Sequence, residues 1–258
     1  MSHFSVMVRI DGSQLLDNHD DFPETVEQML APYEEDPKKD GPNGEKGYWK
    51  NPNAQWNWWQ IGGQWTGHFP IVETATRRID NSDIMRTPAD PHTGDAVLIP
   101  EIDMEKVNSI QAEHYAAFVK EYKKFLITHD DGGFLGIHST LIRFGLLTVK
   151  QNHVGSTLKT ICIPWRGKVK EDDKRKDWTD VVQILTETEL ERFKVCFNPL
   201  HTYAILDENG WKDPGKMHMF GMSEETPESY LKWCNEFNDW MFVQAKPHDM
   251  FVVVDCYI

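Results

Sequence analysis

The sequence predicts an α+β protein in which a mostly antiparallel sheet contains both ends of the chain and helices pack on that sheet. Residues 2–10 alternate apolar and polar side chains, which is typical of a strand with one buried face. Residues 250–258 are nearly all apolar, which favours a strand covered on both faces in the middle of a sheet. Residues 226–242 carry aromatic side chains at helical spacing, so we expect this helix to pack across the terminal strands.

Local signals predict where the main helices begin. Residues 23–33 place apolar side chains on one helical face. Asp103 is a good N-cap for the longest helix, whose apolar positions recur every three or four residues as far as Leu126. Thr226 followed by Pro227 is an N-cap and first-turn pair for the last helix. The other expected elements are a segment ambiguous between helix and strand at 139–149, a strand at 158–163, a short helix at 185–193, and a strand at 201–206 with a turn at 207–210.

Nothing in the sequence marks a domain boundary. The 258 residues contain no internal repeat, no low-complexity linker and no abrupt change of composition. Because both ends of the chain are expected in one sheet, we predict a single α+β domain over residues 1–258, with a helical insertion around residues 101–145.

Composition and charge narrow the classes of partner. The formal net charge is −14, so binding of duplex nucleic acid through dispersed basic side chains is not expected. An acidic chain of this kind can instead act as a decoy that occupies a nucleic-acid-binding protein. No segment approaches the roughly 20 apolar residues of a membrane helix, and the N-terminus resembles no secretory signal. We therefore expect a cytoplasmic protein that makes no membrane contact.

Enzyme and metal signatures are mostly missing. The four cysteines have largely apolar neighbours and form no C-x-x-C pair, so we expect free buried thiols rather than disulfides. The 11 histidines are scattered without metal-type pairing, and we expect neither a metal nor a cofactor. H-E-x-x-H, G-x-S-x-G and G-x-G-x-x-G do not occur, which favours a binding protein over an enzyme. A site that joins Cys256 to His201 or His248 would depend on the fold alone.

A tryptophan-rich segment is the first candidate site. It contains four indoles and a glycine pair: Trp56, Trp58, Trp59, Trp65, Gly62 and Gly63. If the segment is extended, Trp59 lies on the face opposite the other indoles. The glycines allow the backbone to bend or to approach another group closely. The indoles either form a stacking surface for a planar ligand or fill the core, and we expect Trp58 or Trp59 to be exposed.

A turn-rich loop over residues 210–222 is the second candidate site. It carries Trp211, Lys212, Lys216 and His218, whose cationic and imidazole groups could hold an anionic part of a ligand. A packed loop without a ligand is an equally valid interpretation of this composition.

Short motifs occur in a fixed order along the chain. They are Met1-Ser2-His3-Phe4, Leu30-Ala31-Pro32-Tyr33, Asn51-Pro52-Asn53-Ala54, Trp56-x-Trp58, Ile61-Gly62-Gly63-x-Trp65, Gly210-Trp211, Gly215-x-Met217-x-x-Phe220-Gly221-Met222 and Val254-Asp255-Cys256. In these motifs the chain resembles a family of uncharacterised proteins of tailed phages and prophages. The resemblance covers both ends of the chain and is weak between residues 77 and 199. It implies a phage-type accessory protein in the host cytoplasm and brings no established activity.

Three departures from that family pattern bear on function. The chain has Trp56-Asn57-Trp58-Trp59 where the family tends to have Trp-Asp-Trp-Tyr. It has Gln64 where the family tends to have Arg, and Tyr257 where the family tends to have His. These changes remove ionisable groups and keep the aromatic frame, which suits binding better than catalysis.

The sequence thus leads us to expect a phage-type accessory protein that binds a small planar, nucleotide-like ligand through residues 56–65 and 210–222. Such binding would counter a host defence or signalling pathway. Two alternatives stay open: a hydrolase acting on a nucleotide-like substrate, and an acidic interaction module that blocks a host protein.

Overall fold

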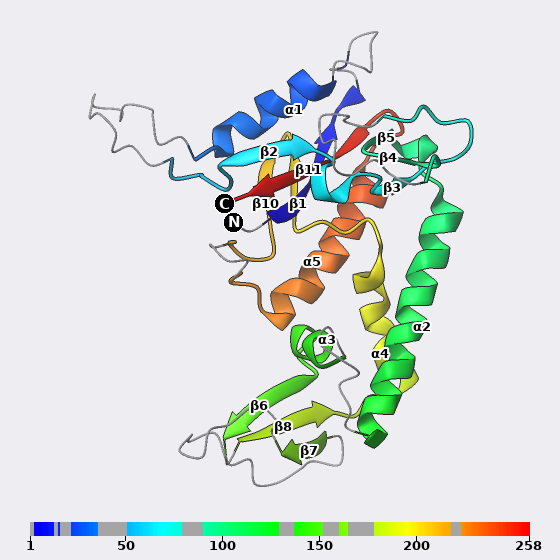
Figure 1. Cartoon of the computed structure of the whole chain (residues 1–258), viewed down its shortest axis with the longest axis vertical. Coiled ribbons are helices and arrows are strands. Elements are labelled where there is room, and N and C mark those ends of the chain that lie inside the picture. Colours follow the sequence, from blue (N-terminus) through cyan, green and yellow to red (C-terminus); the bar gives the residue numbers. More distant parts are fainter. Residues whose placement is uncertain are drawn as a thin grey trace. The chain divides into compact units, whose positions relative to one another are not determined.

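A mixed, mainly antiparallel sheet contains strands from both ends of the chain, as predicted (Figure 1). β1 (His3–Ile10) and β11 (Met250–Tyr257) pair antiparallel along their whole length, from His3 opposite Tyr257 to Ile10 opposite Met250. β11 also has strand partners on its other edge, so it lies inside the sheet as its apolar run indicated. The other strands of this sheet are β2 (Trp58–Ile61) and β5 (Ala96–Leu98) beside β11, β9 (Ala204–Asp207) parallel to β1, and β10 (Gly210–Lys212) beyond β9.

Contacts within the chain divide this computed structural model into two compact units. The structure describes residues 3–12, 15, 22–35, 51–78, 90–128, 137–151, 160–164, 178–217 and 223–258. Unit 1 comprises Met1–Val107, Leu200–Glu225 and Glu236–Ile258, and unit 2 comprises Asn108–Pro199 and Thr226–Asn235. The single domain with a helical insertion stays a prediction, because a division by contacts does not show that either unit folds alone.

One face of the unit 1 sheet is covered by α1 (Phe22–Leu30), which continues as a 3-10 turn over Ala31–Tyr33 (Figure 1). This agrees with the helix predicted at 23–33. The helix buries Phe22, Val26 and Leu30, four residues apart, against the sheet, and removal of this apolar surface from water stabilises the pair. The apolar core on this face consists of Phe4, Val6, Val8, Ile10, Leu15, Phe22, Val26, Leu30, Trp56, Ile61, Ala96, Ala204, Leu206, Met250, Val252, Val254 and Cys256.

The opposite face of the sheet buries charged side chains. Arg9 Nη2 donates to Asp207 Oδ2 at 2.7 Å, and Arg9 Nη1 donates to the Trp240 carbonyl at 3.2 Å. Trp240 Nε1 donates to the same oxygen of Asp207 at 2.7 Å. The Arg9 guanidinium also lies over the Trp240 ring, 4.9 Å from its centroid. Pairing of this kind offsets the desolvation of the two buried charges.

The last helix supplies Trp240 to this charged face. α5 (Pro227–Asp239) begins at the predicted cap, where Thr226 Oγ1 accepts the Ser229 N–H at 3.1 Å. It widens into a π-helical segment over Trp240–Gln244, and the Trp240 ring meets Phe251 of β11 edge-on with 5.3 Å between centroids. The predicted packing of this helix on the sheet is therefore confirmed for its C-terminal part.

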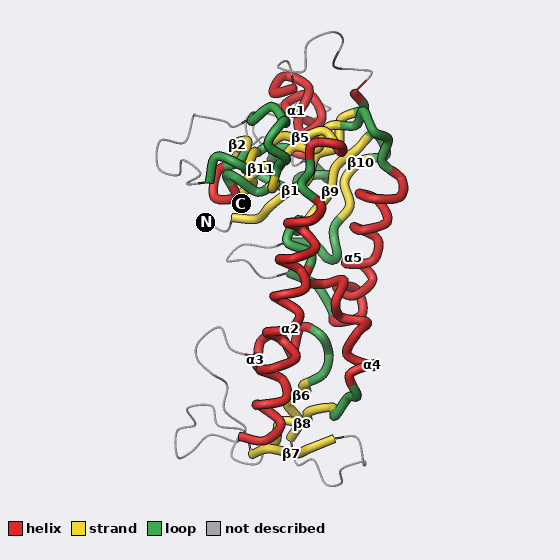
Figure 2. The backbone as a smooth tube through the Cα atoms, turned by 90° about the vertical axis from the view of Figure 1, so that its right-hand side faces the viewer, coloured by secondary structure: helices red, strands yellow, loops and turns green. Residues whose placement is uncertain are grey.

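Unit 2 contains a second antiparallel sheet and most of α2 (Met104–Thr128). The predicted N-cap of α2 is confirmed, since Asp103 Oδ1 accepts the Lys106 N–H at 2.9 Å. The segment that was ambiguous between helix and strand contains both, namely α3 (Ile137–Arg143) and then β6 (Leu147–Gln151). β6 pairs with β8 (Trp178–Gln183), which pairs with β7 (Thr160–Pro164) (Figure 2).

The core of unit 2 is largely aromatic. The short helix predicted at 185–193 appears as α4 (Glu187–Leu190) followed by a 3-10 helix over Glu191–Phe197. Phe144 stacks on Phe193 with 4.7 Å between ring centroids. The buried cluster consists of Phe118, Tyr122, Phe125, Ile137, Leu141, Phe144, Leu146, Leu147, Val182, Leu190 and Phe193. Within the described ranges, no helix has both the length and the apolar character that crossing a membrane requires.

Candidate functional site

The register of three neighbouring strands brings three ring side chains into line. Tyr257 of β11 lies opposite Trp58 of β2 on one side and opposite His3 of β1 on the other. Because side chains alternate along strands, these residues share the charged face of the sheet, while Trp59 and Cys256 lie on the α1 face. We call Trp58, Tyr257 and His3 the aromatic row.

The rings of the aromatic row contact one another and are open to solvent. Trp58 and Tyr257 have centroids 5.0 Å apart with an interplanar angle of 38°, and His3 and Tyr257 are 5.1 Å apart at 40°. Trp58 is 40% exposed. His3 is exposed and Tyr257 is half-buried. The sequence prediction that Trp58 or Trp59 is exposed is therefore confirmed for Trp58.

A buried carboxylate, that of Asp255, forms a hydrogen bond with His3. Asp255 is fully buried; its Oδ1 lies 2.9 Å from His3 Nδ1, and its Oδ2 accepts the Gln64 backbone N–H at 2.9 Å. A carboxylate only accepts hydrogen bonds, so His3 donates through Nδ1, and in the neutral imidazole Nε2 is then the acceptor nitrogen. The pair thereby holds the imidazole in one orientation at the end of the row.

The Gly62-Gly63 turn lies directly on buried carboxylates. Its residues have φ of 70° and 54°, a region that glycine enters without strain. A Cβ on Gly62 would lie 2.3 Å from Asp95 Oδ2, and one on Gly63 would lie 2.4 Å from Asp255 Cβ. Asp95 also accepts the Gly67 N–H at 2.6 Å. The sequence predicted that the backbone at the glycine pair approaches another group closely. In the structure, that group is the side chains of Asp95 and Asp255 rather than a ligand.

The other tryptophans of the segment are partly or wholly in the core. Trp56 is 4% exposed and belongs to the α1-side core, so it does not share a face with Trp58 as an extended segment would require. The reason is that β2 begins only at Trp58. Trp59 packs against the same core, and Trp65 is half-buried at the end of a 3-10 turn.

Residues of the second candidate segment lie at the opposite edge of the sheet. Trp211 of β10 packs against Tyr33, and Lys212 and Lys216 are exposed. β9, β1 and β11 lie between β10 and β2, so the two segments are four strand spacings apart, roughly 19 Å. The structure therefore does not join them into one site. His218 lies outside the described residues.

Sequence reasoning did not select Tyr257, His3 or Asp255 as site residues. One feature of the sequence could have identified Asp255. An aspartate inside the apolar run 250–258 must be buried and must have a polar partner. That partner lies 252 positions away in sequence, so only the strand register identifies it.

In the part of the chain that the structure describes, Cys196, Cys234 and Cys256 are not in disulfide bonds. Cys256 is buried in the α1-side core, and this burial, together with the neighbouring Asp255 charge, raises the pKa of its thiol well above the usual range. His248 precedes the other end of the same strand, so the contact between Cys256 and His248 that the sequence left open is not made.

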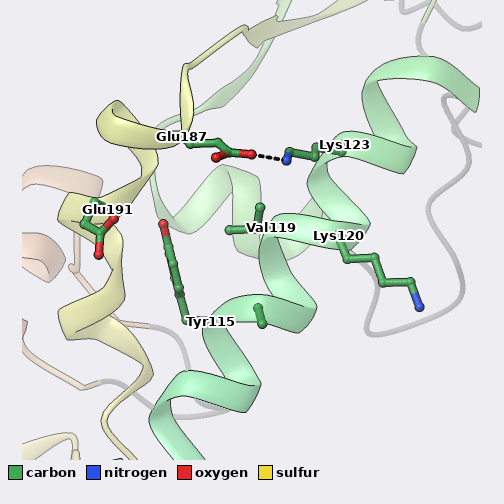
Figure 3. A pocket seen from close by; sticks show the side chains of 7 residues that line it. Tyr115, Val119, Lys120, Lys123, Glu187 and Glu191 are labelled. Atoms are coloured by element: carbon green, nitrogen blue, oxygen red, sulfur yellow. Dashed lines mark hydrogen bonds and ion pairs between the residues drawn. The ribbon is translucent and has the colours of Figure 1, made fainter.

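Unit 2 has a depression of about 470 Å³ between α2 and the segment that starts at α4 (Figure 3). It is lined by Tyr115, Ala116, Val119, Lys120, Lys123, Glu187 and Glu191. The Tyr115 ring forms one wall, and Lys123 pairs with Glu187 across the opening, while Lys120 points away (Figure 3). Exposed pairs of this kind contribute little stability, and the charges that line the depression partly neutralise one another. The aromatic row is therefore the stronger candidate for ligand binding.

Comparisons with protein-family models, with curated proteins and with solved structures find no match for this chain.

Proposed function

We propose that this protein binds a small planar ligand, such as a nucleobase or a nucleotide built on one, on the aromatic row. The observation that carries the proposal is the cross-strand alignment of Trp58, Tyr257 and His3. The Trp58 side chain in this row is 40% exposed to solvent. An exposed indole beside two further rings loses little conformational entropy when a planar ring stacks on it. For a phage-type accessory protein, such binding would withdraw a nucleotide-like signal from the host.

His3 supplies the polar part of the proposed site. Its Nδ1 is engaged by Asp255, and Nε2 stays available to a donor group at the edge of a ligand ring. Stacking tolerates many planar compounds, whereas a hydrogen bond at a defined position discriminates among them. We therefore assign affinity mainly to Trp58 and selectivity mainly to His3.

A binding screen with matched variants tests this proposal. Mono-, di- and cyclic nucleotides are titrated into the wild-type protein and into Trp58→Ala by calorimetry, with thermal unfolding measured in parallel. Loss of a stacked base is worth about 1–3 kcal/mol, which corresponds to a loss of affinity of roughly 5- to 150-fold. We expect this loss in Trp58→Ala without a matching change of melting temperature, because Trp58 is not in the core.

Phe242→Ala is the matched control. Phe242 is an aromatic residue of unit 1 with 38% exposure, close to that of Trp58, but it lies outside the aromatic row. This variant should bind like the wild type. Equal binding by Trp58→Ala and wild type, or no binding of any nucleotide together with a stable complex with a host protein, would contradict the proposal and favour the interaction module.

The His3–Asp255 pair favours one second candidate, a hydrolase for the same ligand class. An imidazole oriented by a carboxylate can act as a general base toward a water molecule. Chromatography of the nucleotides after incubation measures turnover. Turnover by the wild type that His3→Gln abolishes while binding persists would identify the protein as an enzyme.

A further inference from the structure

Three metal-ligand side chains meet at the end of the β1–β11 ladder that is remote from the aromatic row. The strand pairing ends at Ile10 opposite Met250, and Asp11 and Asp249 are the next residues beyond it. His248 precedes Asp249 directly. The eight residues of β1 separate this cluster from the aromatic row by roughly 26 Å, so the two sites are independent.

The ligand atoms of this cluster are close enough for one ion. One atom each from Asp11, His248 and Asp249 lie within 4.8 Å of one another. His248 Nε2 is 3.4 Å from Asp11 Oδ1 and 3.9 Å from Asp249 Oδ1. Ligands about 2.0–2.2 Å from a shared metal ion lie roughly 3–4.4 Å apart, so these separations need little adjustment.

A buried oxygen of Asp249 points independently to a cation. Asp249 is 4% exposed, and its Oδ2 accepts the Lys246 backbone N–H at 2.9 Å. Its Oδ1, on the side of His248, has no hydrogen-bond partner in the part of the chain that the structure describes. A buried carboxylate oxygen without a donor is costly, and a metal ion would satisfy it.

Gly12 holds the two parts of the cluster together. A Cβ at this position would lie 1.9 Å from the His248 carbonyl oxygen, which no side chain tolerates. Only glycine therefore lets the residue after Asp11 approach the backbone of His248.

Two cationic side chains lie near the cluster, and only Arg9 has its main partner elsewhere. Arg9 Nη2 is 2.7 Å from Asp207, while its Nε is 4.0 Å from Asp249 Oδ2 rather than Oδ1. Lys246 Nζ lies 3.2 Å from Asp11 Oδ2, and its side chain is 59% exposed and can move into solvent. Lys246 thus weakens cation binding at the cluster without blocking it.

We propose that Asp11, His248 and Asp249 bind one divalent first-row transition-metal cation, such as Zn²⁺ or Mn²⁺, with water as the remaining ligands. The mixed set of one imidazole and two carboxylates selects against Mg²⁺ and Ca²⁺, which prefer oxygen ligands alone. The sequence led us to expect no metal because its local spacings match no site. Here the ligands come from opposite ends of the chain.

Calorimetric titration of tag-free protein with ZnCl₂, MnCl₂, MgCl₂ and CaCl₂ tests this proposal. We expect one equivalent of Zn²⁺ or Mn²⁺ to bind and weaker binding of Mg²⁺ and Ca²⁺. His248→Gln and Asp11→Asn should each lower Zn²⁺ affinity at least ~10-fold, since even outer-shell changes have effects of that size. Lys246→Met should tighten binding, because it removes a competing cation.

His114→Gln is the control, because it removes an exposed histidine of unit 2 and should leave Zn²⁺ binding unchanged. Thermal unfolding without metal checks that each variant is folded. No Zn²⁺ or Mn²⁺ binding by the wild type would overturn the proposal, and so would wild-type affinity in both His248→Gln and Asp11→Asn.

Discussion

On the face of the unit 1 sheet that α1 covers, the core is apolar, whereas the opposite face buries Arg9, Asp207 and Asp255 with their partners. Apolar contacts are non-directional, so many side chains of suitable volume can satisfy the first face. Buried charges need a partner at a defined distance and angle, so the second face specifies where Trp240 and the Gly62-Gly63 turn must lie.

Both candidate sites belong to the charged face. His3 and Tyr257 lie at one end of the β1–β11 pair, and Asp11 and Asp249 follow its other end. Strand alternation places His3 and Tyr257 on the side of Arg9, and Asp249 lies near Arg9 as well, with 4.0 Å between Asp249 Oδ2 and Arg9 Nε. Buried polar side chains on this face thus orient the exposed groups next to them. The apolar α1 face, by contrast, contributes only to the stability of the fold.

The largest effect should come from removing the strand that the two faces share. Deletion of residues 253–258 takes away the β11 residues that pair with β2 and five of the eight that pair with β1. We expect loss of the cooperative thermal transition, measured by circular dichroism, because both faces lose their central strand. Deletion of Ile258 alone, which lies beyond β11, is the control and should keep the transition. A six-residue truncation that still melts near the wild-type temperature would contradict this prediction.

Neighbouring tryptophans on the two faces should differ strongly in their effect on stability. Trp56→Ala should lower the free energy of unfolding by about 3–5 kcal/mol, since Trp56 is buried in the α1-side core. Trp58→Ala should lower it by less than about 1 kcal/mol, since its ring is partly in solvent. Urea unfolding followed by circular dichroism measures both values. Similar losses in the two variants would show that Trp58 is as much a core residue as Trp56.

A smaller effect should appear as a dependence of stability on pH. The pKa of His68 is lowered to about 4, mainly by burial and to a smaller degree by the nearby His201, while the hydrogen bond to the Leu200 carbonyl acts in the opposite sense. The unfolded chain, with an ordinary histidine pKa of 6.5, therefore takes up a proton that the folded chain resists. The free energy of unfolding should fall as pH decreases from 6.5 towards 4, by about 1–2 kcal/mol for a half-buried ring.

His68→Gln tests this assignment, because an amide can still donate to the Leu200 carbonyl and does not titrate. Urea unfolding at several pH values should show a shallower decline for the variant than for the wild type. Parallel declines in the two proteins would assign the pH dependence to other groups.

The sequence by itself determined the kind of each main element and several of their limits. Periodicity indicated the terminal strands and α1, and short-range capping placed the starts of α2 at Asp103 and α5 at Thr226. Strand alternation also predicted that Trp58 and Trp59 lie on opposite faces. These features depend on residues a few positions apart, so a local pattern contains the information.

Only the tertiary structure decided which side chains meet. The contact between His3 and Asp255, and the cluster of Asp11 with His248, join residues from opposite ends of the chain. The order of strands in the sheet likewise separates Trp58 on β2 from Lys212 on β10, because these strands lie at opposite edges. Strand register is set by pairing and packing across the whole sheet, and no spacing within a single segment encodes it.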